Sequence, residues 1–234
     1  RIWSLMGQAI HTILERADVK ALAERLSMPI TTDFGTWKVS GHTDSVVVDE
    51  TDDAWEISDY KVTSAWSIKN PKPEWTAQLN CYAALFRHHG FPVSRLRVIV
   101  ILRDWSKLEA LRSSDYPQRQ AQIVPVDLWT AAAAMAYIHE RVRLHQAARI
   151  SLPDCAAEDR WQKPDVYAVV KDGRKSALRL LDSHDAAATW LATNTKPGEA
   201  RIAHRPGEST RCKAYCAAAP FCTQWAALAK ETAE

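Results

Sequence analysis

The chain has 234 residues, of which 47% are hydrophobic and 25% charged, a composition typical of an ordinary soluble globular protein. Its net charge of +2 neither requires nor excludes a nucleic-acid partner, because one groove can be basic while the total is near neutral. No apolar run reaches the roughly 18 residues of a membrane span and no secretory signal is visible, so we expect a cytoplasmic protein with no membrane partner.

Glycine is scarce in this sequence. Only 7 glycines occur, and none forms a G-x-G-x-x-G or G-x-x-x-x-G-K-[ST] loop. Because such loops hold the phosphates of common nucleotide cofactors, folds of that kind are disfavoured. The chain also opens without Met, directly in a helical pattern, so we expect a fragment that lacks an N-terminal segment.

The first half of the chain begins with a helical pattern. Apolar residues at helical spacing predict a helix over residues 2–26, which Pro29 ends. Alternating runs over 30–62 then predict a meander of about three antiparallel strands. The runs are Thr36–Val39, Asp44–Val48 and Ala54–Val62.

Further along, a helix, a strand and a connection are expected. A helix should run from Glu74 to His89 and end at Gly90, followed by a buried strand over Leu96–Leu102. Residues 104–125 are predicted to form an irregular surface connection. This order of elements predicts an α/β fold.

The second half begins with a long helix and continues into a separate unit. The helix is expected over Leu128–Ala148, and the new unit should start near Pro153. A hairpin around Asp172-Gly173 and three later elements make up this unit. Its expected elements are strands Val166–Val170 and Ala177–Leu181, helix His184–Asn194, strand Ala200–His204 and helix Thr223–Ala233.

Charged residues occur in the predicted strands where apolar residues are expected. Asp59 and Lys61 project to one face because strand side chains alternate, and hairpin pairing would bring Asp44 beside Asp59. Two adjacent carboxylates repel each other unless a cation lies between them, and Mg²⁺ or Mn²⁺ prefers such oxygen ligands. A metal there activates water, and a lysine stabilises negative charge on a phosphate. The pattern fits phosphodiester hydrolysis; the alternative is a surface ion pair within one strand.

Four short motifs follow one another in this region. They are Gly7-Gln-Ala-Ile-His11-Thr-Ile-Leu-Glu15, Gly41-His-Thr-Asp44, Ile57-Ser-Asp59-Tyr-Lys61 and Gln78-Leu-Asn-Cys-Tyr82. Each motif is weak alone, but their order and spacing over roughly residues 5–103 are specific. With them the sequence resembles the PD-(D/E)XK nuclease superfamily, within it the RecB-like branch of CRISPR-associated exonucleases and phage nucleases.

The resemblance implies a restriction-endonuclease-like core, with a mixed central sheet flanked by helices. It implies that His11, Asp44, Asp59 and the Tyr60 carbonyl bind Mg²⁺ or Mn²⁺. Lys61 would be the catalytic lysine. Gln78 and Tyr82 would contact the DNA strand or that lysine. The alternatives are a solvated His11 and a Tyr82 that belongs to the core; Asp59 also replaces the Glu commoner in this branch.

Five cysteines occur, and three of them lie close together. Cys212, Cys216 and Cys222 can wrap one metal centre, with Cys155 as a fourth ligand, whereas Cys81 fits a small buried residue. The sequence resembles RecB-like nucleases in which a distant cysteine and a C-terminal triplet hold a 4Fe–4S cluster. Here the distant cysteine follows the nuclease core instead of preceding it. A structural Zn²⁺ site is the alternative, with free thiols a third possibility.

Basic residues gather around the predicted hairpin turn of the second unit. Arg174 and Lys175 could contact a DNA backbone, with Trp161 and Tyr167 nearby to stack bases. The alternative is an ordinary solvated hairpin.

We therefore expect a metal-dependent DNA nuclease of three parts. These are a RecB-like core (1–150), a small α+β accessory unit (151–208) and a cysteine cluster with a closing helix (209–234). The resemblance implies an exonuclease that prefers single-stranded DNA. A D-W-S-K segment at 104–107 is similar to phage members, which suggests phage recombination or DNA processing in a bacterial host, with a recombination or integration protein as partner. The alternative is a nucleic-acid-binding or assembly module that does not cleave.

Overall fold

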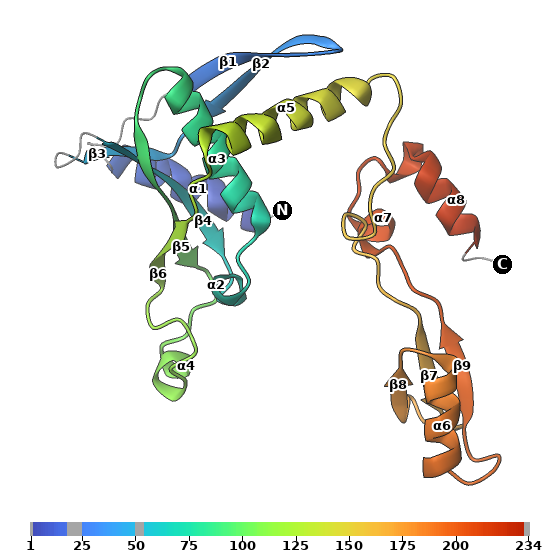
Figure 1. Ribbon diagram of the computed structural model, residues 1–234. Coiled ribbons are helices and arrows are strands. Elements are labelled where there is room, and N and C mark those ends of the chain that lie inside the picture. Colours follow the sequence, from blue (N-terminus) through green and yellow to red (C-terminus); the bar gives the residue numbers. More distant parts are fainter. Residues whose placement is uncertain (1, 18–24, 50–53, 232–234) are drawn as a thin grey trace. The chain divides into compact units, whose positions relative to one another are not determined.

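The computed structural model describes residues 2–17, 25–49 and 54–231 (Figure 1). The chain divides into two compact units, Arg1–Ser151 and Leu152–Glu234, each of which is described by itself. None of the helices in the described ranges is long and apolar enough to cross a membrane.

A four-stranded sheet forms the centre of the first unit, in the order β3-β4-β5-β6. β3 pairs antiparallel with β4, β4 parallel with β5, and β5 antiparallel with β6, so the sheet is mixed. The middle strands supply the fully buried Ile57, Val98 and Val100, which all point to one face of the sheet. The strands are β3 (Ser45–Asp49), β4 (Ala54–Thr63), β5 (Val93–Leu102) and β6 (Ala121–Val126).

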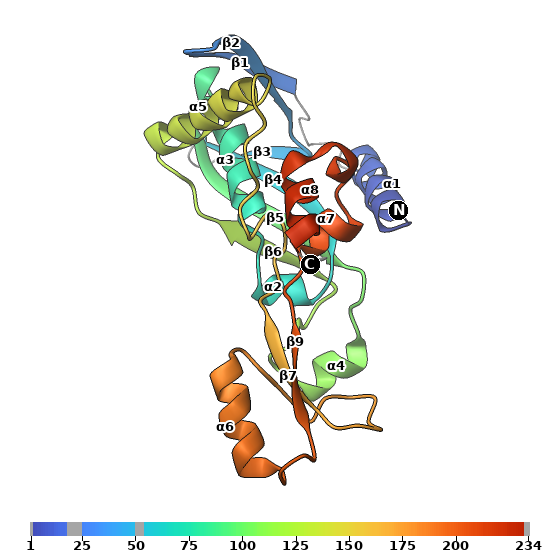
Figure 2. The same cartoon turned by 90° about the vertical axis from the view of Figure 1, so that its right-hand side faces the viewer.

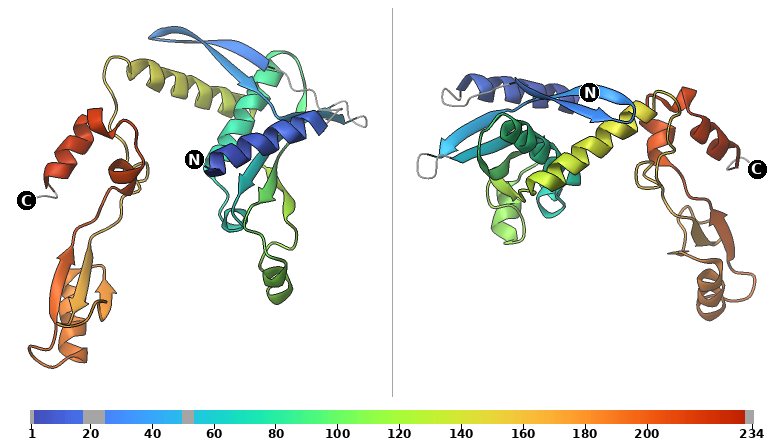
Figure 3. Two further views of the ribbon diagram at one scale, coloured as in Figure 1. Left: turned by 180° about the vertical axis from the view of Figure 1, so that it is seen from behind. Right: turned by 45° about the horizontal axis from the view of Figure 1, so that its top comes forward.

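Helices flank this sheet on opposite faces. On one face the Trp55 ring of β4 lies 5.6 Å from Phe86 of α3 (Pro73–His88). On the other face the Tyr60 ring of β4 lies 6.3 Å from His11 of α1 (Ile2–Ala17). Accordingly, α3 lies in front of the sheet in Figure 1 and α1 in front of it in the left panel of Figure 3. The expectation of an α/β fold with a mixed sheet flanked by helices is confirmed.

A second apolar layer packs against the outer side of α3. It consists of a two-stranded sheet, β1 (Arg25–Thr32) and β2 (Gly35–His42), and the helix α5 (Ala131–Ala147). Met28 and Ile30 from β1 are buried together with Leu85 of α3 and Ile138 of α5. This layer places the last residues of β2 directly against α3.

Two expectations about the start of the first unit were wrong, the helix over 2–26 and the meander. The structure describes a helix over Ile2–Ala17; residues 18–24 lie outside the described ranges, and Arg25 and Leu26 already belong to β1. Pro29 does not end a helix but lies inside this strand, opposite Lys38. The strands of the predicted meander belong to two sheets, since β1 and β2 pair only with each other.

The third correction concerns residues 104–125, predicted to be irregular. They contain a short helix, α4 (Lys107–Arg112), and the start of β6. Ser106 caps α4, because its hydroxyl accepts a hydrogen bond from the backbone of Glu109. Residues Trp66–Lys69 form a further short helix, α2.

The second unit contains a three-stranded sheet in the order β8-β7-β9, with α6 packed on it (Figure 2). In its described residues the buried hydrophobic side chains are Ala168, Val169 and Ala187, a very small core. Its elements are β7 (Val166–Val170), β8 (Arg179–Leu181), α6 (His184–Asn194), β9 (Arg201–Arg205), α7 (Thr210–Ala214), η1 (Ala219–Phe221) and α8 (Thr223–Glu231).

Candidate active site

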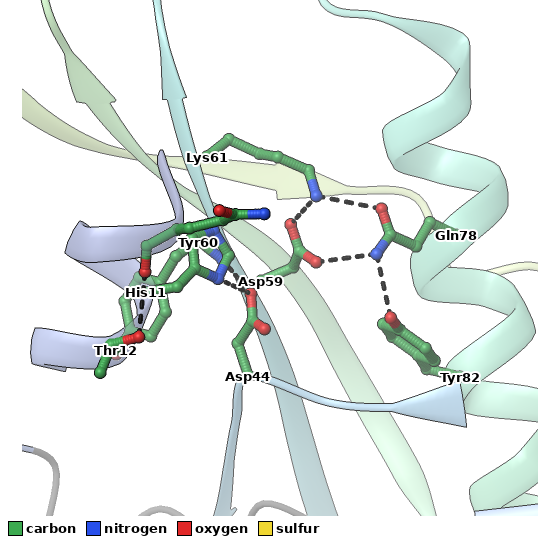
Figure 4. A network of polar contacts seen from close by, with 9 residues as sticks. His11, Thr12, Asp44, Asp59, Tyr60, Lys61, Gln78 and Tyr82 are labelled. Atoms are coloured by element: carbon green, nitrogen blue, oxygen red, sulfur yellow. Dashed lines mark hydrogen bonds and ion pairs between the residues drawn. The ribbon is translucent and has the colours of Figure 1, made fainter. Parts of the chain in front are cut away.

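Six polar side chains from four elements converge at one end of the central sheet (Figure 4). Asp44 precedes β3, and Asp59 and Lys61 lie two residues apart on β4, on the face that α3 covers. The remaining side chains come from the flanking helices, with His11 on α1 and with Gln78 and Tyr82 one turn apart on α3. The structure thus brings together residues that the sequence spreads over more than seventy positions.

The amide of Gln78 organises one half of this cluster. Its oxygen accepts a hydrogen bond from Lys61 Nζ at 3.0 Å, and its nitrogen donates to Asp59 Oδ1 at 3.0 Å and to the Tyr82 hydroxyl at 2.9 Å. Lys61 Nζ also lies 2.5 Å from Asp59 Oδ2. Gln78 therefore fixes the position of the lysine and of the carboxylate at the same time.

Asp44 anchors the other half of the cluster. Its Oδ2 accepts a hydrogen bond from the backbone N–H of Tyr60 at 2.9 Å, which links the start of β3 to the middle of β4. The same oxygen lies 3.4 Å from His11 Nδ1. The Asp44 carboxylate is thus held beside Asp59 and faces an imidazole from the opposite side of the sheet.

Burial dominates the electrostatics of Asp59, whose exposed fraction is 2%. Removal from water raises the pKa of Asp59 above its ordinary value, and the negative charge of Asp44 adds to this shift, while Lys61 and His11 oppose it. Burial also raises the pKa of the Tyr82 hydroxyl, so Tyr82 is a neutral hydrogen-bonding group. The cluster has an excess of buried negative charge that a bound cation would balance.

The donor set fits a hard divalent cation. Asp59 Oδ2 is buried, and among the described residues it contacts the Lys61 ammonium as an ion pair at 2.5 Å, with no further hydrogen bond. Two carboxylates with a neighbouring imidazole and backbone carbonyl are ligands that Mg²⁺ and Mn²⁺ accept. Within the described ranges, no three His, Cys, Asp or Glu side chains are yet arranged around a common metal position. The residues are therefore suitable in kind for such an ion.

Gly41 has a steric role that its place in the sequence does not reveal. A Cβ atom at this position would lie 2.7 Å from Tyr82 Cε1 and 2.9 Å from Leu85 Cδ1. The backbone of β2 therefore touches the Tyr82 ring, and only glycine allows this approach. Through Tyr82 this contact sets the position of the Gln78 amide.

We expect Gly41→Ala to displace the Tyr82 ring and to destabilise the first unit by about 1–3 kcal/mol, the usual cost of overpacking. DNA hydrolysis should fall as well, because Gln78 loses the hydroxyl that it bonds. Thermal unfolding measures the first effect. Gly7→Ala is the matched control, because nothing lies within 4 Å of its Cβ position, and it should be neutral or slightly stabilising in helix α1. An unchanged melting temperature for Gly41→Ala would contradict the steric argument.

The four predicted cysteine ligands all lie in the second unit. Cys155 precedes β7, and its backbone N–H and C=O both bond to the Gln224 side chain, at 2.9 and 3.0 Å. Cys222 Sγ accepts a hydrogen bond from the Trp225 N–H at 3.4 Å. Burial raises the pKa of the Cys212 thiol, and the thiols of Cys216, Cys155 and Cys222 raise it further.

Three thiols therefore act electrostatically on Cys212, although among the described residues no three such side chains surround a common point. Cys81 belongs to the first unit, on α3, where burial raises the pKa of its thiol. Sequence reasoning missed Gln224, and no motif marks it. Arg174 and Lys175 are exposed in the turn between β7 and β8.

The comparisons with known proteins identify the class. The family model described as the PD-(D/E)XK nuclease superfamily matches residues 6–223. This match covers most of the chain, so the chain belongs to the PD-(D/E)XK nuclease superfamily. A search of curated proteins gave no match. Among solved structures, "Crystal structure of SSO0001" is similar at 14% sequence identity and a TM-score of 0.42. The similarity covers 60% of each chain, so this chain spans about 60% of that protein's length.

Proposed function

We propose that the protein is a metal-dependent deoxyribonuclease that hydrolyses phosphodiester bonds by direct attack of water. The observation that carries the proposal is the Asp59–Lys61–Gln78 network, held beside Asp44 and His11 at one end of the sheet. Members of this superfamily are generally nucleases. No Ser or Cys side chain takes part in the network, which favours water as the nucleophile over a covalent enzyme intermediate.

His11, Asp44, Asp59 and the Tyr60 carbonyl would hold Mg²⁺ or Mn²⁺. When bound, such an ion polarises a phosphate oxygen and lowers the pKa of a water molecule. Lys61 keeps its ammonium group directed by Gln78 and Asp59, where it can orient the attacking water and stabilise negative charge on the phosphate. Because Gln78 fixes the lysine in advance, little reorganisation is needed during the reaction.

Within the superfamily we assign the chain to the RecB-like branch and to exonucleolytic action on single-stranded DNA. The support is the order of the four motifs and the position of Gln78 and Tyr82. Both residues lie on one face of α3, beside the proposed catalytic lysine. Tyr82 is partly exposed beside this lysine.

We also propose that Cys155, Cys212, Cys216 and Cys222 hold a 4Fe–4S cluster in the second unit. Three described hydrophobic residues are buried there, too few to stabilise a fold of this length without a staple. Gln224 fixes the backbone of Cys155, and the Trp225 N–H donates to the Cys222 sulfur, as N–H groups do around metal thiolates. Zn²⁺ is the alternative occupant.

The test of nuclease activity uses end-labelled single-stranded and duplex DNA with Mg²⁺, Mn²⁺ or excess EDTA. We expect metal-dependent cleavage that EDTA abolishes, faster on the single strand, with mononucleotides or short products released from one end. DNA that is bound but never cut with either metal would overturn the enzyme assignment and leave a binding module. Internal cuts in a circular single strand would overturn the exonuclease assignment alone.

A further inference from the structure

We propose that a basic hollow in the second unit is an additional phosphate-binding site, which holds the backbone of the DNA strand independently of its sequence. The hollow lies between one face of the β7–β9 pair and the loop 171–177, and has a volume of about 320 Å³. This inference rests on the proposed function for its choice of DNA, and it concerns a surface outside the candidate active site.

The ladder between β7 and β9 explains why arginines line one face. Residues directly opposite each other in an antiparallel pair point to the same side, and successive residues alternate. Arg201 lies opposite Val170, and Arg205 lies opposite Val166, so both arginines share a face with the buried Ala168. The loop that follows β7 adds Lys171, Arg174 and Lys175 to the same hollow.

The positive charge of this hollow is only partly neutralised. Lys171 Nζ lies 2.7 Å from Glu199, and Arg201 Nε lies 3.8 Å from Asp172 in an exposed, weak pair. Arg174, Lys175 and Arg205 have no ion pair with a carboxylate in the part of the chain that the structure describes. Unpaired cations around one concave surface attract a polyanion.

The loop is held in place by several contacts. Gly173 takes a left-handed backbone angle, φ 82°, which permits the turn, and Arg174 N donates to the Lys171 carbonyl at 3.2 Å. Leu178 N donates to the Val169 carbonyl at 2.8 Å, which closes the loop onto β7. A site fixed in this way loses little conformational entropy when a ligand binds.

The aromatic side chains nearby do not serve this hollow. Tyr167 alternates to the opposite face of β7, where its ring stacks on His204 at 4.9 Å and meets His184 of α6 edge-on. His204 in turn bonds Asp165 at 2.8 Å. Tyr167 therefore does not offer a stacking surface for bases in the hollow. What remains are cations, which recognise phosphate and carry no base specificity.

The experiment measures binding of fluorescent oligothymidylate in EDTA, so that no strand is cut, for the parent and for an Arg201→Ala/Arg205→Ala variant. We expect about tenfold weaker binding near 0.1 M salt and a salt slope lower by about 1.4, since each single-strand phosphate contact contributes about 0.7. Arg205→Ala alone is compared with Arg179→Ala. Arg179 lies opposite Val169 and therefore faces the other side of the same sheet, so its loss should leave binding unchanged. Equal effects of the two single variants, or an unchanged double variant, would overturn the site.

A second assay separates this inference from the nuclease assignment. The p-nitrophenyl ester of thymidine 5′-monophosphate is a substrate without a DNA strand, so its hydrolysis reports on the active site and does not involve the hollow. If the parent hydrolyses it and the double variant does so equally, the loss seen with oligothymidylate belongs to the hollow. The parent protein could instead hydrolyse neither the ester nor DNA and still need Arg201 and Arg205 to bind the strand. The nuclease assignment would then be wrong, and the phosphate-binding site would be confirmed. Parent protein that does not bind the strand overturns the hollow directly.

Discussion

Asp59→Asn is expected to lower DNA hydrolysis about a thousandfold or more, while the protein still folds and binds single-stranded DNA. The amide keeps the shape of the carboxylate, but it removes the buried negative charge that a divalent cation requires. Lys61 also loses its ion-pair partner, the Oδ2 atom at 2.5 Å. Initial rates on end-labelled DNA with Mg²⁺ and Mn²⁺ measure the loss, and oligothymidylate binding in EDTA checks that the strand is still held.

The chain offers a matched control on the same strand. Glu56 lies three residues before Asp59 and points to the opposite face, where it pairs with Arg97 at 2.6 Å and with Arg95 at 3.3 Å. Glu56→Gln removes one carboxylate charge from β4 without touching the candidate site, so hydrolysis should stay near the parent rate. If Asp59→Asn kept a tenth of the parent rate, or if both variants lost activity equally, Asp59 would not be the catalytic carboxylate.

Elements with a strong local signal could be predicted from the sequence. The helix α3 begins at Pro73 and is followed by Gly90 at φ 85°, two residues that mark helix ends by their backbone preferences alone. The apolar run of β5 likewise identifies a strand, in which buried residues alternate with partly buried ones from Leu96 to Leu102. The start of the strand β1 was missed because Leu26 continues the helical spacing of the apolar residues before it, and only pairing with β2 decides between helix and strand.

The strand β6 shows the same limitation. Its residues alternate, but Pro125 and the polar Gln122 weaken the strand signal, and Val124 and Val126 become core residues only because β5 lies beside them. Non-local pairing also hides Arg201 and Arg205. Nothing in the sequence around position 200 indicates that β9 returns along β7 and places its arginines beside the loop 171–177.

The candidate site was predictable in composition but not in organisation. Motif order named His11, Asp44, Asp59, Lys61 and Gln78, and the structure places these side chains next to one another. The order of the motifs did not indicate that the Gln78 amide bonds Lys61, Asp59 and Tyr82 together, because that arrangement depends on the distance between β4 and α3. The reason for a glycine at position 41 is likewise a three-dimensional one, the approach of β2 to Tyr82.

Cys212→Ser is expected to remove the visible absorbance of a bound cluster and to lower the melting temperature of the second unit by about 10 °C or more. Burial raises the pKa of the Cys212 thiol, and the three other cysteines raise it further, so in the absence of a metal this thiol favours its neutral, uncoordinated form. A metal centre reverses this preference, because coordination requires thiolates. The fold of the second unit would then depend on the metal centre, because its hydrophobic core is small: the buried hydrophobic residues described there are Ala168, Val169 and Ala187.

Cys81→Ser is the control for this variant, because Cys81 belongs to the first unit, on α3, and the four thiols belong to the second. It should keep the brown colour, the iron content and the melting temperature of the second unit. Iron and zinc analysis of the parent, purified without oxygen, separates the occupants. A colourless parent with stoichiometric zinc would replace the cluster by a zinc staple, because the same thiolates suit both centres. The parent protein could also contain neither metal, and its second unit could melt at the same temperature as in Cys212→Ser. That result would show that the thiols are free and that the small core of this unit stabilises it without a metal.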